Sequence, residues 1–260
     1  MKLAILSNIN ANFIVQKLTS KYEIYQPAGY DTWIQELLDI YSELYKFAPQ
    51  AILILLDGYE LTRTGNTVNE GIQELDIAFE AICRAVNHLP NSAIFVSSLD
   101  IVQHRIIPLD KIRPERVWEW YWYNKVHSII NENKNVFIAD IKELAERIGR
   151  NNFYSSKLWY TGSIPYSLKG TAAICEKIEY LLAAWQGQRS KCLVVDLDNT
   201  LWGGVIGEEG IDGIELSNSK EGSRYRDLQL RIRELKETGV ILAIVSKNNI
   251  EDVMDVFNHH

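Results

Sequence analysis

Short apolar runs alternate with amphipathic helical segments along most of this chain, and that alternation constrains the fold more than any other feature. The runs are rich in β-branched and aliphatic residues, and each is followed by a small or polar residue. They lie at 3–6, 51–56, 93–96, 136–139, 192–195 and 240–245, with a weaker run near 22–25. Apolar residues recur at helical spacing between them, as in 34–45 and 72–86. Because parallel strands need crossover helices and are buried on both faces, the pattern predicts a doubly wound α/β fold.

A polar stretch around Gly187 divides the chain in two. Residues 1–187 contain five of the runs, enough for a complete Rossmann-like or flavodoxin-like parallel-sheet domain. Residues 188–260 contain only two, whereas a doubly wound domain needs about 100 residues or more. We therefore expect two α/β domains, the second of which is truncated.

Composition excludes several classes of protein. The 34 acidic and 27 basic residues leave a net charge of −7, which argues against nucleic acid or an anionic membrane as the main partner. No apolar run reaches the roughly 18 residues that span a bilayer, and Met1 is not followed by a secretory signal. The three cysteines are widely spaced and form no CxxC pair. These features predict a cytoplasmic protein without a disulfide framework.

Two carboxylates follow the run at 192–195, at the edge of the sheet where α/β proteins bind ligands. Asp196 and Asp198 lie two residues apart, so their side chains come close together and repel unless a cation lies between them. Mg²⁺ would take oxygen ligands from Asp196 and from the backbone carbonyl near Asp198, leaving positions for water and a phosphate. Asp196 is then the predicted nucleophile and Asp198 the proton shuttle. The alternative is that Asp198 or Asn199 caps a helix.

A second polar segment follows the run at 240–245. Ser246, Lys247 and Asn248 precede a helix that is opened by Glu251 and Asp252. A hydroxyl and successive backbone N–H groups at a helix N-terminus can hold a transferring phosphoryl group. Ser246 taken alone would only cap the helix.

The segment after Asp198 is rich in glycine and includes Trp202, Gly203 and Gly204. Glycines permit tight turns with positive φ, so the segment is predicted to be a flap in which Trp202 closes over the site and excludes water. The alternative is a surface hairpin with Trp202 in the core.

Together these motifs resemble a known superfamily. Asp196-Leu-Asp198-Asn199-Thr200, with Ser246 after the next strand, resembles the haloacid dehalogenase (HAD) superfamily of aspartate-nucleophile phosphatases and phosphotransferases. The glycine-rich continuation at 201–216 resembles the FkbH-like group within it. Upstream, Ile5-Leu-Ser-Asn8, the segments 35–39 and 42–45, Leu158-Trp-Tyr160 and Pro165-Tyr-Ser167 resemble the amino-terminal half of the same proteins.

The resemblance implies an SGNH-hydrolase-like domain over 1–187 and the amino-terminal part of a HAD-like phosphatase domain over 188–260. It implies that Asp196 is nucleophile and magnesium ligand, that Asp198 is acid/base and a ligand through its carbonyl, and that Ser246 binds the phosphoryl group. It implies a phosphorylated, glycerate-type substrate and transfer of a glyceryl unit to an acyl carrier protein. It also puts a further lysine and acidic metal ligands beyond His260.

An SGNH-like domain would have a site of its own. Ser7 would be its nucleophile, Asn8 an oxyanion donor and Asp57 a further site residue, but residues 160–166 lack the histidine that activates the serine. The alternative is that Ser7 and Asn8 cap a helix that begins near Asn10. A non-catalytic module that binds a carrier protein or serves as a scaffold therefore remains a second hypothesis. Lys111, Arg113 and Arg116 are its candidate contacts for an acidic partner.

Overall fold

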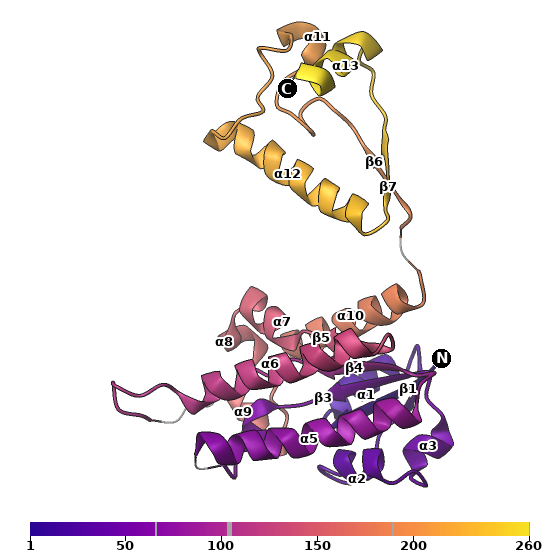
Figure 1. Ribbon diagram of the computed structural model, residues 1–260, viewed down its shortest axis with the longest axis vertical. Coiled ribbons are helices and arrows are strands. Elements are labelled where there is room, and N and C mark those ends of the chain that lie inside the picture. Colours follow the sequence, from indigo (N-terminus) through magenta and orange to yellow (C-terminus); the bar gives the residue numbers. More distant parts are fainter. Residues whose placement is uncertain (66, 103–105, 189, 260) are drawn as a thin grey trace. The chain divides into compact units, whose positions relative to one another are not determined.

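A computed structural model describes residues 1–260 except 66, 103–105, 189 and 260 (Figure 1). Contacts between Cα atoms divide the chain into two units, Met1–Gly187 and Gln188–His260. Each unit is described by itself. Among the described helices, none combines the length and the apolar character needed to cross a membrane.

Unit 1 is built on a parallel sheet in the order β2-β1-β3-β4-β5. The strands are β1 (Lys2–Ser7), β2 (Glu23–Tyr25), β3 (Ala51–Leu55), β4 (Ala93–Ser97) and β5 (Val136–Ala139). The apolar runs therefore predicted every strand of this sheet, including the weak run near 22–25.

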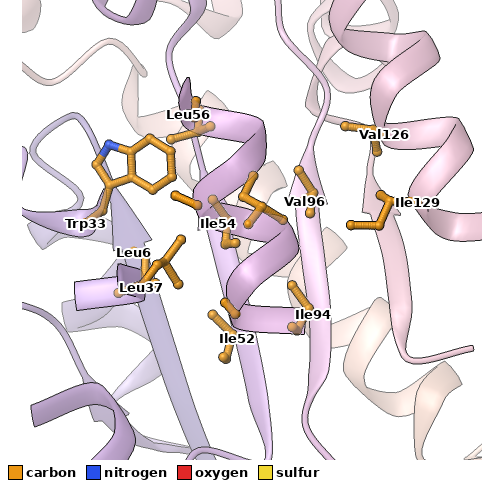
Figure 2. Packing of buried hydrophobic residues seen from close by; sticks show 14 of the residues in the cluster. Leu6, Trp33, Leu37, Ile52, Ile54, Leu56, Ile94, Val96, Val126 and Ile129 are labelled. Atoms are coloured by element: carbon orange, nitrogen blue, oxygen red, sulfur yellow. The ribbon is translucent and has the colours of Figure 1, made fainter. Parts of the chain in front are cut away.

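Helices cover both faces of the sheet (Figure 1). Side chains of β3 alternate between two cores: Ile52 and Ile54 pack with the first core, Leu53 and Leu55 with the second. Figure 2 shows the first core, where Trp33 and Leu37 meet Ile52 and Ile54. The α/β prediction is confirmed.

The helices of unit 1 are α1 (Asn12–Leu18), α2 (Trp33–Leu38), α3 (Glu43–Phe47), α4 (Gly58–Thr62), α5 (Val68–His88), α6 (Pro114–Glu132), α7 (Ile141–Ile148), α8 (Arg150–Phe153), α9 (Ser156–Gly162) and α10 (Leu168–Trp185).

The helical spacing over 34–45 does not form one helix. The segment divides into α2 and α3 because Asp39 is extended and side chains satisfy the free backbone groups between the helices. The Ser42 hydroxyl donates to the Glu36 carbonyl over 2.9 Å, and Glu36 Oε2 accepts from Leu44 N over 3.2 Å. These side-chain hydrogen bonds stabilise a break between α2 and α3, where the apolar periodicity alone predicted a continuous helix.

Unit 2 has two parallel strands, β6 (Cys192–Val195) and β7 (Ile241–Ile244). Its core lies between the segment after β6 and α13 (Ile250–His259), and includes Leu197, Trp202, Ile206 and Val256. Val194 and Ile244 are exposed, in contrast to the buried strands expected from the sequence, because the core collects around the loop after β6 instead of over the sheet. The other helices are α11 (Ile206–Glu209) and α12 (Lys220–Glu237).

Candidate functional site

Asp196 and Ser246 lie at the same edge of unit 2. Val195 pairs with Ile244, and Val245 N donates to Val195 O over 3.1 Å, so the ladder continues to the end of both strands. Adjacent strands are about 4.8 Å apart, which puts the residues following them side by side. The exposed Asp196 carboxylate accepts a hydrogen bond from Leu197 N over 2.8 Å.

The Asp198 carboxylate is half-buried and held in a fixed orientation. Its Oδ1 accepts from Trp202 Nε1 over 3.0 Å and from Ile206 N over 3.2 Å. Helix α11 begins after Val205, so neither Asp198 nor Asn199 is its N-cap. The Asp198 carboxylate nevertheless accepts from Ile206 N, the first N–H of α11, as a capping side chain does, and the chain from 199 to 206 wraps around it.

The glycine-rich segment is tightly folded. Asn199 has a φ of 55°, and its side-chain oxygen accepts from Gly204 N over 3.0 Å. Gly204 has a φ of 92°, and a Cβ there would lie 2.7 Å from the Glu209 carboxylate. Gly203 exchanges both backbone hydrogen bonds with Glu215. Trp202 is 1% exposed and lies in the core, as the alternative interpretation has it, so its indole does not cover the site from the solvent side.

The segment after β7 is a tight polar turn. Ser246 Oγ accepts from Asn248 N over 3.2 Å, and Asn249 Oδ1 accepts from Glu251 N over 3.3 Å. Asn249 and not Ser246 therefore caps the start of α13. Ser246 and Lys247 are exposed, whereas Asn248 Nδ2 is buried and has no hydrogen-bond acceptor. A buried amide donor without a partner is costly, so this atom would gain from an acceptor that the described residues do not supply.

The oxygen atoms at this edge of the sheet are of the type that a hard cation such as Mg²⁺ prefers. Within the described part of the chain, no three His, Cys, Asp or Glu side chains gather into a metal site. Mg²⁺, however, commonly binds through one or two carboxylates and completes its shell with water and substrate phosphate. The exposed Asp196 carboxylate, with the carbonyl of Asp198, fits such a partial site.

In unit 1, Ser7 ends β1 and Asn8 follows it, but neither residue caps α1. Ser7 Oγ donates to Ile9 O over 3.2 Å and accepts from Ile9 N over 3.1 Å. Asn8 is buried and exchanges hydrogen bonds of 3.0 and 2.8 Å with the backbone of Asp57. Asn10 Oδ1 accepts from Asn12 N at the start of α1. The capping alternative was wrong, because the Ser7 hydroxyl bonds to the Ile9 backbone, while the Asn8 side chain joins the ends of β1 and β3.

Asp57 is 8% exposed, and its Oδ1 accepts from Glu60 N over 2.9 Å at the start of α4. Burial raises its pKa to about 6, and the negative charges of Glu60 and Asp100 act in the same direction. Sequence reasoning missed Asp100, which pairs with Arg150 and accepts a hydrogen bond from the Tyr154 hydroxyl over 3.0 Å. The one sequence signal for Asp100 as a site residue is its position shortly after the apolar run that forms β4.

No protein-family model matches the sequence, and a search of the curated proteins found no match. Solved structures do match. The N-terminal part of protein BF1531 from Bacteroides fragilis, which contains a phosphatase domain and was crystallised with Mg, is 22% identical with a TM-score of 0.86. The likeness covers 100% of this chain and 72% of that one.

Two other matches are looser. A family 3 carbohydrate esterase from Clostridium thermocellum is 16% identical with a TM-score of 0.46, over 71% of this chain and 98% of that one. A putative lipolytic G-D-S-L protein from Desulfitobacterium hafniense is 12% identical with a TM-score of 0.40, over 69% and 98%. At these TM-scores neither supports an argument. The chain therefore shares, over its whole length, the α/β fold of a solved structure that contains a phosphatase domain.

Proposed function

We propose that this protein is a magnesium-dependent phosphatase or phosphotransferase of the HAD type, with Asp196 as the nucleophile. The observation that carries the proposal is the position of the exposed Asp196 carboxylate beside the Ser246 turn, at the carboxyl edge of two parallel strands. The fold likeness to a structure that contains a phosphatase domain complexed with Mg supports it.

A phosphoryl site needs donors for the phosphoryl oxygens and ligands for Mg²⁺, and this edge has candidate residues for both. The Ser246 hydroxyl, exposed Lys247 and the unpartnered Asn248 amide supply donors and a positive charge for phosphoryl oxygens. Asp196 and the Asp198 carbonyl would hold Mg²⁺, which neutralises negative charge on the phosphoryl group when bound. Asp198, oriented by Trp202 and Ile206, supplies the acid/base group.

The reaction then has two steps. In the first, an Asp196 carboxylate oxygen attacks phosphorus, the bond from phosphorus to the leaving oxygen breaks, and protonated Asp198 gives its proton to that oxygen. In the second, ionised Asp198 takes a proton from water while the water oxygen attacks phosphorus. Inorganic phosphate leaves and the Asp196 carboxylate is restored.

The resemblance to FkbH-like enzymes narrows the proposal to a glycerate-type phosphorylated substrate, whose glyceryl unit passes to an acyl carrier protein. Attack of Asp196 on an acyl phosphate would release a free carboxylate, so transfer of the glyceryl unit needs a separate step. In that step a carrier thiol would attack the acyl carbonyl carbon, the bond from this carbon to the phosphate oxygen would break, and phosphate would leave. Unit 1 would then be the SGNH-like domain of such an enzyme, and a cytoplasmic location follows from the same assignment.

A non-catalytic carrier-binding or scaffolding role is the second candidate. It is favoured by the scarcity of acidic metal ligands, since no three candidate ligands gather within the described residues. Lys111, Arg113 and Arg116 are exposed and carry the positive charge that suits an acidic partner, and Arg116 pairs with Glu119 over 3.0 Å.

Phosphate release from acetyl phosphate separates the two candidates. We expect release that depends on Mg²⁺, is stopped by EDTA and is abolished by Asp196→Asn. The matched control is Asp227→Asn, which removes an exposed carboxylate on α12 and should leave the rate unchanged. Equal rates for the parent and Asp196→Asn would contradict the catalytic proposal and leave the carrier-binding role.

A further inference from the structure

Unit 1 contains a cavity of about 330 Å³ at the carboxyl end of β1, and Asp57 is not among its lining residues. Three segments that are distant in sequence form its wall: the end of β1 with the start of α1, the loop between β2 and α2, and the end of α9. Its volume is at the lower end of the range of small-molecule sites, about 300–1,000 Å³. The lining residues are Ile5, Ser7, Ile9, Asn10, Asn12, Gln26, Pro27, Gly29, Tyr30, Thr32, Gly162 and Ser163.

The lining is polar and uncharged. Seven of the lining side chains are hydroxyls or carboxamides, and none is Lys, Arg, Asp, Glu or His. Sites for anions are commonly built with Lys or Arg and sites for cations with a carboxylate, because burying an unpaired charge is costly. Hydroxyls and carboxamides instead both donate and accept hydrogen bonds. The wall thus suits a neutral ligand that has many hydroxyl groups.

One lining residue has a hydroxyl without a partner. Thr32 Oγ1 is buried and has no hydrogen-bond partner. By contrast, Asn10 is already occupied, since its Oδ1 accepts from Asn12 N and its Nδ2 donates to Gly162 O. Because Thr32 Oγ1 is closed off from solvent, a bound hydroxyl group would reach it only after the side chain turns toward the cavity, and the new hydrogen bond would then recover the free energy of the unpartnered hydroxyl.

Two residues at the cavity have left-handed backbone conformations. Ser163, with a φ of 54°, is the C-cap of α9, and Asp31, between the lining residues Tyr30 and Thr32, has a φ of 56°. Tyr30 is 51% exposed, which leaves part of its ring open to a ligand.

We infer that this cavity binds a neutral polyhydroxylated molecule, of the class of a simple sugar or polyol. The site binds its ligand without converting it, because the Ser7 hydroxyl donates to the Ile9 carbonyl instead of to a base. The inference concerns unit 1 alone and stands independently of the chemistry proposed for Asp196.

Saturation-transfer NMR on the full chain tests the inference, with D-glucose, D-xylose and glycerol as neutral probes. Glucuronate supplies the anionic probe and cyclohexanol the apolar one, and neither carries a phosphate that unit 2 could bind. We expect saturable binding of at least one neutral probe, with a dissociation constant below about 10 mM. Glucuronate and cyclohexanol should bind much more weakly.

The variant Thr32→Val removes the unpartnered hydroxyl and keeps the shape of the side chain. We expect it to weaken binding about three- to tenfold, the effect of losing one hydrogen bond, without lowering the Tm of the free protein. Thr171→Val is the matched control, since Thr171 Oγ1 is also buried and unpartnered but lies in α10 outside the cavity. Equal effects of the two variants, tighter binding of glucuronate, or no saturable binding of any neutral probe would each overturn the inference.

Discussion

The indole nitrogen of Trp202 donates a hydrogen bond to the Asp198 carboxylate over 3.0 Å. The same carboxylate oxygen accepts from Ile206 N, so the core of unit 2 and the proposed acid/base group are held together by one side chain. Packing in the loop after β6 and the orientation of Asp198 are therefore linked, and a change in one should be measurable in the other.

Trp202→Phe should separate packing from orientation. Phenylalanine keeps most of the apolar contact but cannot donate to Asp198, which should cost about 1 kcal/mol of stability. Phosphate release should fall more for a phenyl phosphate ester, whose leaving oxygen needs a proton, than for acetyl phosphate. Steady-state rates with both substrates provide the measurement, and an equal loss with the two would argue against acid catalysis by Asp198.

Gly204→Ala should destabilise unit 2. Its φ of 92° is unfavourable for alanine, and the new Cβ would lie 2.7 Å from the Glu209 carboxylate. We expect a loss of about 1–3 kcal/mol. The control is Gly207→Ala, where nothing lies within 4 Å of the added Cβ. Because Gly207 is helical, alanine there should stabilise by about 0.5–1 kcal/mol. Hydrogen exchange of the unit 2 amides can measure the stability of both variants. Similar exchange rates in Gly204→Ala and Gly207→Ala would contradict the proposal that the backbone at Gly204 requires glycine.

Asp57→Asn should stabilise unit 1 at neutral pH. The folded carboxyl has a pKa of about 6, against 3.8 for an aspartate in an unfolded chain, so the folded state holds its proton more tightly than the unfolded chain. Stability from this group is therefore fully present below pH 4 and is lost as the pH rises to 6, by about 3 kcal/mol. Asparagine avoids this loss and still caps α4.

Urea unfolding at pH 4 and pH 8, followed by tryptophan fluorescence, measures the effect of Asp57→Asn. The free energy of unfolding of Asp57→Asn should exceed that of the parent at pH 8 and equal it at pH 4. Asp57→Ala serves as the control because it also removes the cap, and it should lose about 1 kcal/mol relative to Asp57→Asn at both pH values. A gain of equal size at the two pH values would mean that burial of the charge is not its cause.

Ser7→Ala should leave phosphate release unchanged, because the Ser7 hydroxyl bonds only to Ile9 in unit 1 among the contacts described. Hydrolysis of p-nitrophenyl acetate should be at the background rate in both the parent and the variant. Parent esterase activity that disappears in Ser7→Ala would instead make Ser7 a nucleophile and restore an SGNH hydrolase.

The sequence predicted β3 and β4 well because each is a continuous apolar run, and burial on both faces demands such runs. It failed where a side chain binds a distant backbone group. Asn8 and Asp57 are 49 residues apart, and no local pattern indicates that their groups meet. The break between α2 and α3 depends on Glu36 accepting from Leu44 N, a contact that periodicity does not encode.

The apolar runs also predicted the position of Asp196 and Ser246, but not the side-chain contacts around them. Asp196 and Ser246 each follow an apolar run, so their shared edge follows from parallel pairing of the two strands. The burial of Trp202 was left open by the sequence, because glycine-rich turns suit both a flap and a hairpin over a core. The contact with Asp198 decided between them.

The most direct test of the account is the position of a phosphoryl label on the protein. Asp198→Asn should still allow Asp196 to attack acetyl phosphate but should impair attack by water, so rapid quenching followed by peptide mass analysis should find phosphoaspartate at Asp196. Asp196→Asn should carry no label under the same conditions. Label on Ser246 or Ser7, or equal labelling of the two variants, would contradict the assignment of Asp196 as the nucleophile.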